Sequence, residues 1–206
     1  LREETRQSGP VLVHTDLRVT DSNLQIVAQS LWHYLKISPE PATLERLLVE
    51  NVATGPTILM NRHLLEKVCP IPQGVPHHDW WIALVAATFG RVVALHEATV
   101  LYRRHSANHT GEYTNVTSGF RHWASKVLGA PGRTSELHRW LVASAAQAGT
   151  FLDRFEDELP QEVQVMLQEY SEIPNLGLLE RKLRVLRMRA LPEHGVLRNL
   201  GLLLRA

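Results

Sequence analysis

Several features that define a protein class at once are scarce or missing in this chain. Cys69 is the one cysteine in 206 residues, so no intrachain disulfide can form and a reducing, cytoplasmic setting is expected. The 22 basic and 21 acidic residues leave a net charge of +1, which gives no bulk attraction for nucleic acid. No apolar run reaches the roughly 18 residues of a membrane span, and residues 1–10 are too polar for a signal peptide. We therefore expect a soluble globular protein.

The sequence signatures of several common enzyme classes are missing as well. The chain has no Gly-x-Ser-x-Gly, no Walker A run, no Cys-x-x-Cys and no His-Glu-x-x-His, which argues against the corresponding hydrolases, nucleotide triphosphatases, redox proteins and zinc peptidases. What is present is ordinary for a folded domain: 44% hydrophobic and 21% charged residues, enough apolar content for a sizeable core.

The first half of the chain alternates strand and helix signals. Strands are predicted at 11–19, 54–60 and 91–102, the last interrupted near His96-Glu97, and helices at 22–36, 43–49, 61–68 and 79–89. A Pro- and Gly-rich loop is predicted at 69–76. Two or three strands are few for an α/β sheet, whose usual number is nearer five or six. The sheet therefore looks incomplete.

After about residue 112 only helical periods remain. Helices are predicted at 118–128, 134–158, 160–170, 176–189 and 196–204, separated by breaks that contain glycine or proline. The predicted organisation is an α/β piece, residues 1–112, followed by an all-helical extension, residues 113–206.

The densest group of chemically capable side chains is Pro76-His-His-Asp-Trp-Trp81. Asp79 can serve as the N-cap of the helix that follows, with the tryptophans in the core. Alternatively, a carboxylate at the mouth of a Pro- and Gly-rich loop is well placed to take a proton from a substrate hydroxyl, and the indoles of Trp80 and Trp81 offer flat faces that pack against sugar rings.

A second group follows the last predicted strand, at Tyr102-Arg-Arg-His-Ser-Ala-Asn-His109. Arg103, Arg104, His105 and His109 suit the oxygens of a diphosphate, and His105 alternatively suits a metal ion. A solvated basic loop is the other interpretation of the same residues. The remaining single histidines on predicted elements are best explained as surface or core residues.

A basic amphipathic stripe lies near the carboxyl end, at Arg181–Arg189, and is extended by Arg198 and Arg205. Its simpler interpretation is a solvated helix face. Its functional interpretation is contact with anionic lipid headgroups or with a protein partner.

Taken in order, four stretches resemble the family 2 glycosyltransferases, in particular the rhamnosyltransferase-like branch that builds bacterial surface polysaccharides. They are Val11–Asp21, Asn51–Thr57, His78-Asp-Trp-Trp81 with its helix through Gly90, and Tyr102–Asn108. The resemblance covers roughly residues 10–112. It implies a GT-A-like (Rossmann-like) α/β fold and inverting transfer of a sugar, such as rhamnose, from a nucleotide diphosphate donor to a saccharide or lipid-linked acceptor.

The resemblance also implies residue roles. Asp79 corresponds to the catalytic base that deprotonates the acceptor hydroxyl, and His105 to a residue that contacts the donor diphosphate and its metal ion. Substrate-binding positions are implied for Thr54, Gly55, His78, Trp80, Trp81, Arg103 and Arg104. The implied cofactor is a divalent cation, Mg²⁺ or Mn²⁺, which neutralises the leaving diphosphate. Such an enzyme works in the cytoplasm, in some cases at the inner face of the cell membrane.

This chain departs from the family at its amino-terminal side. Family members begin with a nucleotide-binding strand and glycine-containing turn, followed by an Asp-x-Asp metal motif just before the strand that begins here at Val11, and neither is present. The expectation is therefore a truncated GT-A-like sheet, with most of the metal ligands upstream of this chain. Two rivals stay open: a non-catalytic interaction module that docks a membrane or protein through the basic stripe, and a phosphate-dependent hydrolase using Asp79 and the histidines.

Overall fold

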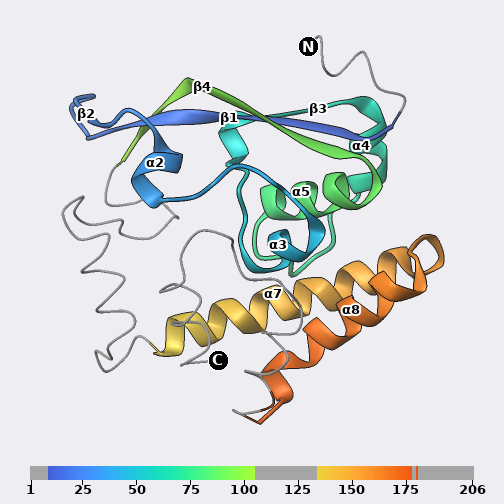
Figure 1. Cartoon of the computed structure of the whole chain (residues 1–206). Coiled ribbons are helices and arrows are strands. Elements are labelled where there is room, and N and C mark those ends of the chain that lie inside the picture. Colours follow the sequence, from blue (N-terminus) through green and yellow to red (C-terminus); the bar gives the residue numbers. More distant parts are fainter. Residues whose placement is uncertain (1–8, 105–133, 178–179, 181–206) are drawn as a thin grey trace.

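The computed structural model describes residues 9–104, 134–177 and 180 (Figure 1). In them a mixed sheet lies over a layer of helices, and two further helices pack beneath that layer, so the α/β prediction is confirmed. The strands are β1 (Val11–Thr20), β2 (Ile26–Ala28), β3 (Ile58–Met60) and β4 (Arg91–Arg103). The helices are α2 (Leu31–Leu35), α3 (Leu44–Val49), α4 (Arg62–Val68), α5 (His78–Phe89), α7 (Thr134–Phe155) and α8 (Gln161–Glu172). Short 3₁₀ turns are η1 (Gly55–Thr57), η3 (Glu156–Glu158) and η4 (Ile173–Asn175).

Strand β1 is the centre of the sheet. Strand β4 runs parallel to it along its whole length, and β3 and β2 pair antiparallel with its beginning and its end. Parallel strands in such sheets are buried and read as continuous apolar runs, which explains the opening Val11-Leu12-Val13. Gly90 brings β4 to β1, because a Cβ at this position would lie 1.8 Å from the carbonyl oxygen of Pro10.

The predicted interruption near His96-Glu97 is present as a bulge inside one long strand. Thr15 pairs with Leu95, but the next residue, Asp16, pairs with Ala98. Residues 96 and 97 are thus extra residues on β4, which is how a strand absorbs an insertion without ending.

The helix predicted at 22–36 is mostly wrong. The carboxylate of Asp21 accepts the backbone N–H groups of Asn23 and Gln25 at 2.8 and 2.9 Å, which fixes a turn that competes with helix formation. Leu24 has a positive φ of 64°. Strand β2 follows, and the helix is only α2, capped by Ser30 through a bond from the backbone of His33.

Elements defined by local signals agree better with the prediction. Asn61 caps α4 by accepting the N–H of Leu64 at 3.0 Å, as expected from its side chain. The strand predicted at 54–60 is half right, because the Gly-Pro pair forms η1 and only β3 is extended. Helices α7 and α8 lie within two residues of their predicted ends, apart from the stretch 156–158, which is η3.

The core lies between α5 and the long helices. Trp80 and Trp81 are 1% and 0% exposed. Trp80 stacks on Trp140 with ring centroids 5.2 Å apart, and Trp81 packs against Phe151 and Phe155 at 5.4 and 6.2 Å. We call these five residues the aromatic cluster. It joins α5 to α7, so the described helical extension and the α/β piece share one core.

Two polar side chains strengthen this junction. The hydroxyl of Tyr170, on α8, donates to the carbonyl oxygen of Leu48 at 2.9 Å and contacts Ser144 Oγ at 3.0 Å. Burial raises the pKa of the Tyr170 hydroxyl to about 12. Arg154, on α7, donates to the carbonyl oxygens of Lys67, Cys69 and Pro70, which include the exposed carbonyls at the end of α4.

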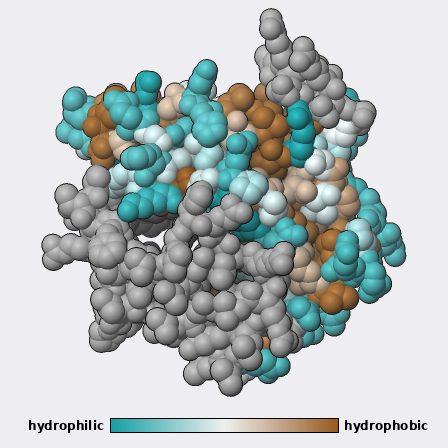
Figure 2. Space-filling model, viewed as in Figure 1, coloured by the Kyte–Doolittle hydropathy of each residue, from teal (hydrophilic) through white to brown (hydrophobic). Residues whose placement is uncertain are grey.

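All described helices lie on one side of the sheet (Figure 1). On the other side the register places Val13 in a row with Leu59 and Val93, and Leu59 and Leu95 are 42% and 43% exposed. Apolar surface is visible along the sheet in Figure 2. The sheet is therefore covered by described helices on one face.

Several predictions concern residues outside the described ranges. They are the helices at 118–128 and 196–204, nearly all of the helix at 176–189, the boundary between residues 112 and 113, His105, His109 and the basic stripe. Among the described helices, none is both long and apolar enough to cross a lipid bilayer.

Candidate functional site

The site is built where the segment 51–55 meets the first turn of α5. The prediction that Asp79 caps α5 is wrong. The N-cap is His77, which makes no side-chain cap bond, and Asp79 is the second residue inside the helix. Its carboxylate is therefore available for contacts elsewhere.

The Asp79 carboxylate accepts three hydrogen bonds from described residues. Oδ2 accepts the backbone N–H of Gly55 at 2.9 Å. Oδ1 accepts the side-chain amide of Asn51 at 3.1 Å and the backbone N–H of Trp80 at 2.8 Å. Two of the three donors come from the 51–55 segment, so the fold joins two stretches that are separated in the sequence. Both stretches are among the four that resemble the glycosyltransferase family.

The space around Gly55 is tight on the side that faces α5. A Cβ on Gly55 would lie 3.2 Å from Nε2 of His78 and 3.4 Å from Oδ2 of Asp79. His77 and His78 are exposed, and Asp79 and Thr54 are partly exposed. We call Asn51, Gly55, His78 and Asp79 the carboxylate cluster. It offers an oriented carboxylate on a partly exposed residue, and an oriented carboxylate is what general-base chemistry requires.

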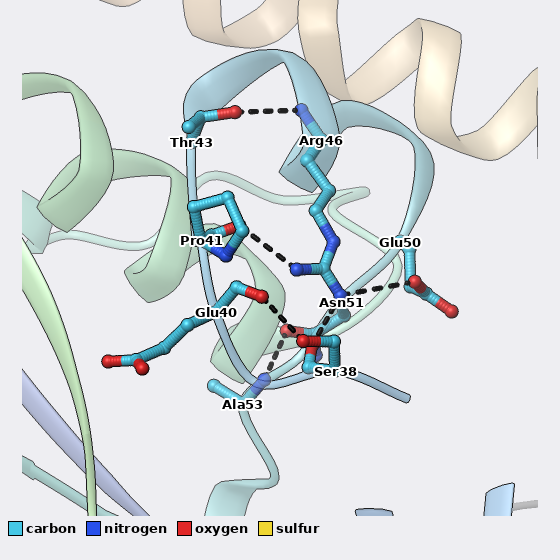
Figure 3. A network of polar contacts seen from close by, with 8 residues as sticks. All are labelled: Ser38, Glu40, Pro41, Thr43, Arg46, Glu50, Asn51 and Ala53. Carbon is cyan, nitrogen blue, oxygen red and sulfur yellow. Dashed lines mark hydrogen bonds and ion pairs between the residues drawn. The ribbon is translucent and has the colours of Figure 1, made fainter. Parts of the chain in front are cut away.

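The segment that carries Asn51 has a firm base in α3 (Figure 3). The guanidinium of Arg46 donates to the carbonyl oxygens of Ser38 and Pro41 and pairs with Glu50 at 3.6 Å. Both side chains of that pair are largely buried. Asn51 follows Glu50 directly, and its Oδ1 accepts the N–H of Ala53 at 3.1 Å. Its position is thus fixed from both sides.

Trp80 and Trp81 are not part of the accessible site, which corrects the expectation that they bind a sugar. The faces of both indoles are occupied by other aromatic rings of the described residues. Trp80 Nε1 also donates to the carbonyl oxygen of Leu47. The helical period carries these side chains inward while Asp79 stays at the helix end, so they form the wall behind the site.

The two arginines of the second group lie at the carboxyl end of β4. The backbone N–H of Arg104 donates to the carbonyl oxygen of Thr20 at 2.9 Å. Neither Arg103 nor Arg104 is among the three donors to Asp79. The structure therefore brings Thr54, Gly55, His78 and Asp79 together, and the described hydrogen bonds of Asp79 do not extend this group to the arginines.

The described residues do not form the ligand set of a divalent cation, and His105, the residue expected to contact it, lies outside them. In the described ranges no group of three or more His, Cys, Asp or Glu side chains is placed to hold a metal ion. Asp16 accepts the backbone N–H groups of Leu17, Leu31 and Trp32 through Oδ1. Its carboxylate orients the start of α2.

A second buried polar residue, His14, lies on β1. The imidazole is 0% exposed, and neither ring nitrogen has a hydrogen-bond partner among the described residues. Its ring meets the edge of Trp32 at 5.4 Å. Burial lowers the pKa of His14 from 6.5 to about 4, with opposing smaller effects of Glu40, which raises it, and His96, which lowers it.

Two of these residues were missed from the sequence. Asn51 opens the stretch Asn51–Thr57 that resembles the family, and its position before the Thr-Gly pair was the available signal. His14 was visible as one polar residue in an apolar strand. Its burial depends on Trp32 and on the pairing of β1, which the sequence pattern does not specify.

No protein-family model, curated protein or solved structure matches this chain.

Proposed function

We propose that this chain is the acceptor-side part of a GT-A-like inverting glycosyltransferase, in which Asp79 is the general base. The donor would be a nucleotide diphosphate sugar, such as one carrying rhamnose, and the acceptor a saccharide or lipid-linked hydroxyl in cell-envelope polysaccharide synthesis. One observation carries the proposal: the carboxylate of Asp79, besides accepting the N–H of Trp80 in its own helix, is held by Asn51 and Gly55 of the second family-like stretch.

The proposed chemical role is to accept the proton of the acceptor hydroxyl while the carboxylate is held in a fixed orientation. As the acceptor oxygen bonds to the anomeric carbon, the bond from that carbon to the diphosphate oxygen breaks, and the diphosphate leaves with the electron pair. The proton of the acceptor hydroxyl passes to Asp79. Because attack and departure occur on opposite faces of the sugar, the anomeric configuration inverts. Fixed N–H donors keep the carboxylate from rotating while the proton moves.

Surrounding residues support binding rather than proton transfer. Thr54 and Gly55 form the turn against the carboxylate, and the exposed His78 imidazole lies over Gly55. A sugar hydroxyl approaching Asp79 would meet these groups first. Arg103 and Arg104 belong to the proposal as diphosphate contacts. The proposal also includes a divalent cation, whose ligands would lie outside the described residues.

The test is replacement of Asp79 by Asn in the complete natural reading frame that contains this chain. Loss of the base is expected to reduce the transfer rate by roughly 10²- to 10⁴-fold, measured as release of nucleoside diphosphate from the donor in the presence of acceptor. The matched control is Asp153→Asn, since Asp153 is exposed on α7. A near-normal rate for a correctly folded Asp79→Asn protein would rule out the general-base role.

A further inference from the structure

The hydrogen bonds of Asn51 have a fixed direction. Asn51 Oδ1 accepts the backbone N–H of Ala53, and Nδ2 donates to Oδ1 of Asp79, each at 3.1 Å. A backbone N–H can only donate, and an ionised carboxylate can only accept. The amide of Asn51 therefore cannot be flipped without losing both bonds.

Together with Gly55, this amide determines the plane of the Asp79 carboxylate. Rotation about the last bond of an aspartate side chain is soft, with broad energy wells. Here one oxygen is bound by Asn51 Nδ2 and the other by the N–H of Gly55. Both donors belong to one short segment, so the carboxylate cannot rotate without breaking at least one of these bonds.

The count of acceptor sites then distinguishes the two oxygens. An ionised carboxylate has about four lone-pair sites. Within the described residues, Oδ1 accepts two hydrogen bonds, from Asn51 and Trp80, and Oδ2 accepts one, from Gly55. The site left for an incoming hydroxyl is on Oδ2.

We infer that Asn51 is a positioning residue for Asp79, which orients the carboxylate so that Oδ2 receives the acceptor proton. This inference rests on the proposed function. Asn51 does not touch the substrate: it acts through Asp79. Its own support is the end of α3, where the buried Arg46–Glu50 pair lies next to it in the chain (Figure 3).

The experiment compares Asn51→Ala and Asn51→Asp in the complete reading frame, alone and combined with Asp79→Asn. Asn51→Ala is expected to lower kcat about 10- to 100-fold through misplacement of the base, while the KM for the acceptor changes little. Asn51→Asp has the same size but replaces the donor with a second carboxylate beside the first, so a larger loss is expected. Asn23→Asp, at an exposed position, is the charge-matched control and is expected to be silent.

The double variant separates positioning from a merely structural role. If Asn51 acts through Asp79, adding Asn51→Ala to Asp79→Asn causes no further loss in kcat. An equal loss in both backgrounds, or an unchanged kcat in Asn51→Ala and Asn51→Asp, overturns the inference while leaving the proposed function intact. A near-normal rate for Asp79→Asn alone overturns the proposed function, and the positioning role with it.

Discussion

Two adjacent pairs of residues at the start of α5 have opposite environments. His78 and Asp79 face accessible space and the 51–55 segment, whereas Trp80 and Trp81 are enclosed by rings from α7. From the sequence, the four residues are predicted to form a single substrate-binding motif. In the structure the carboxylate cluster is exposed or partly exposed, and the aromatic cluster packs α5 against α7. Substitutions in the aromatic cluster should therefore lower the free energy of unfolding, and substitutions in the carboxylate cluster should lower the transfer rate.

The largest expected effect is on stability, from Trp81→Ala in the aromatic cluster. Removing this buried ring leaves a cavity against Phe151 and Phe155, and the free energy of unfolding should fall by about 3–5 kcal/mol. Urea denaturation followed by circular dichroism measures it. His78→Ala, three positions earlier, is the control and should change stability by about 0.5 kcal/mol or less. Equal losses in the two variants would remove the distinction between the clusters.

The next effect concerns pH and tests His14, a buried side chain that, unlike Asp79, has no hydrogen-bond partner among the described residues. The unfolded chain binds a proton at His14 below pH 6.5, but the folded chain does so only near pH 4. Stability should therefore fall as the pH drops through this window, by about 3 kcal/mol in all. His14→Phe should remove this part of the pH dependence, measured as urea midpoints between pH 7 and about 4. The exposed His33, changed to Phe, serves as the control, and the same pH profile in wild type and His14→Phe would contradict the prediction.

A smaller effect is expected at the polar contact between α8 and α3. Tyr170→Phe leaves the buried carbonyl of Leu48 without its donor, which should cost about 1–3 kcal/mol. Because the Arg46–Glu50 pair still holds the end of α3 next to Asn51 in this variant, kcat should be unchanged at temperatures where the protein is folded. Ser171→Ala, the next residue on α8, is the control, because its hydroxyl only bonds within the helix. A loss of kcat in the folded Tyr170→Phe protein would show that the two clusters are coupled.

The smallest change in stability is expected for Gly55→Ala. The added methyl would press against the ends of His78 and Asp79, and the exposed imidazole can move away, so the free energy of unfolding should change by about 0.5 kcal/mol or less. The transfer rate should nevertheless fall, because the methyl lies against Oδ2 of Asp79 and narrows the approach of the acceptor to it. Thermal melting and initial rates measured on the same sample check both parts. A rate at the wild-type level would show that the approach to Oδ2 does not pass Gly55.

What the sequence predicts correctly depends on how local the deciding contact is. Asn61 caps α4 through a residue three positions away, and Gly90 ends α5 next to its own strand. Such signals act within one turn of the chain and are visible in the pattern. The helix predicted over 22–36 failed although the competing signal, Asp21, was also local. The helical spacing of apolar residues over 22–36 predicted a helix, but the turn that the Asp21 side chain stabilises prevents it from starting there.

The arrangement of the site depends on distant contacts. Nothing near Trp81 announces that Phe151 and Phe155 will enclose it, and nothing near Asp79 announces Asn51. These partners meet only after α3, α5 and α7 have packed. The candidate base was therefore predictable from its neighbours along the chain. The residue that orients it, and the burial of the two tryptophans, required the tertiary structure.

Under the proposed function, the enclosure of α5 also indicates which neighbouring segment can change over evolution or in a designed library without disturbing Asp79. The body of this helix is buried along most of its length, so its first turn cannot shift without rebuilding the core. The connection that precedes it, residues 69–77, is free of helix and strand and is mostly exposed or partly exposed. Insertions and substitutions are tolerated best in such segments. Under the proposed function, libraries that vary residues 71–77 while keeping α5 intact would test whether this connection selects the acceptor.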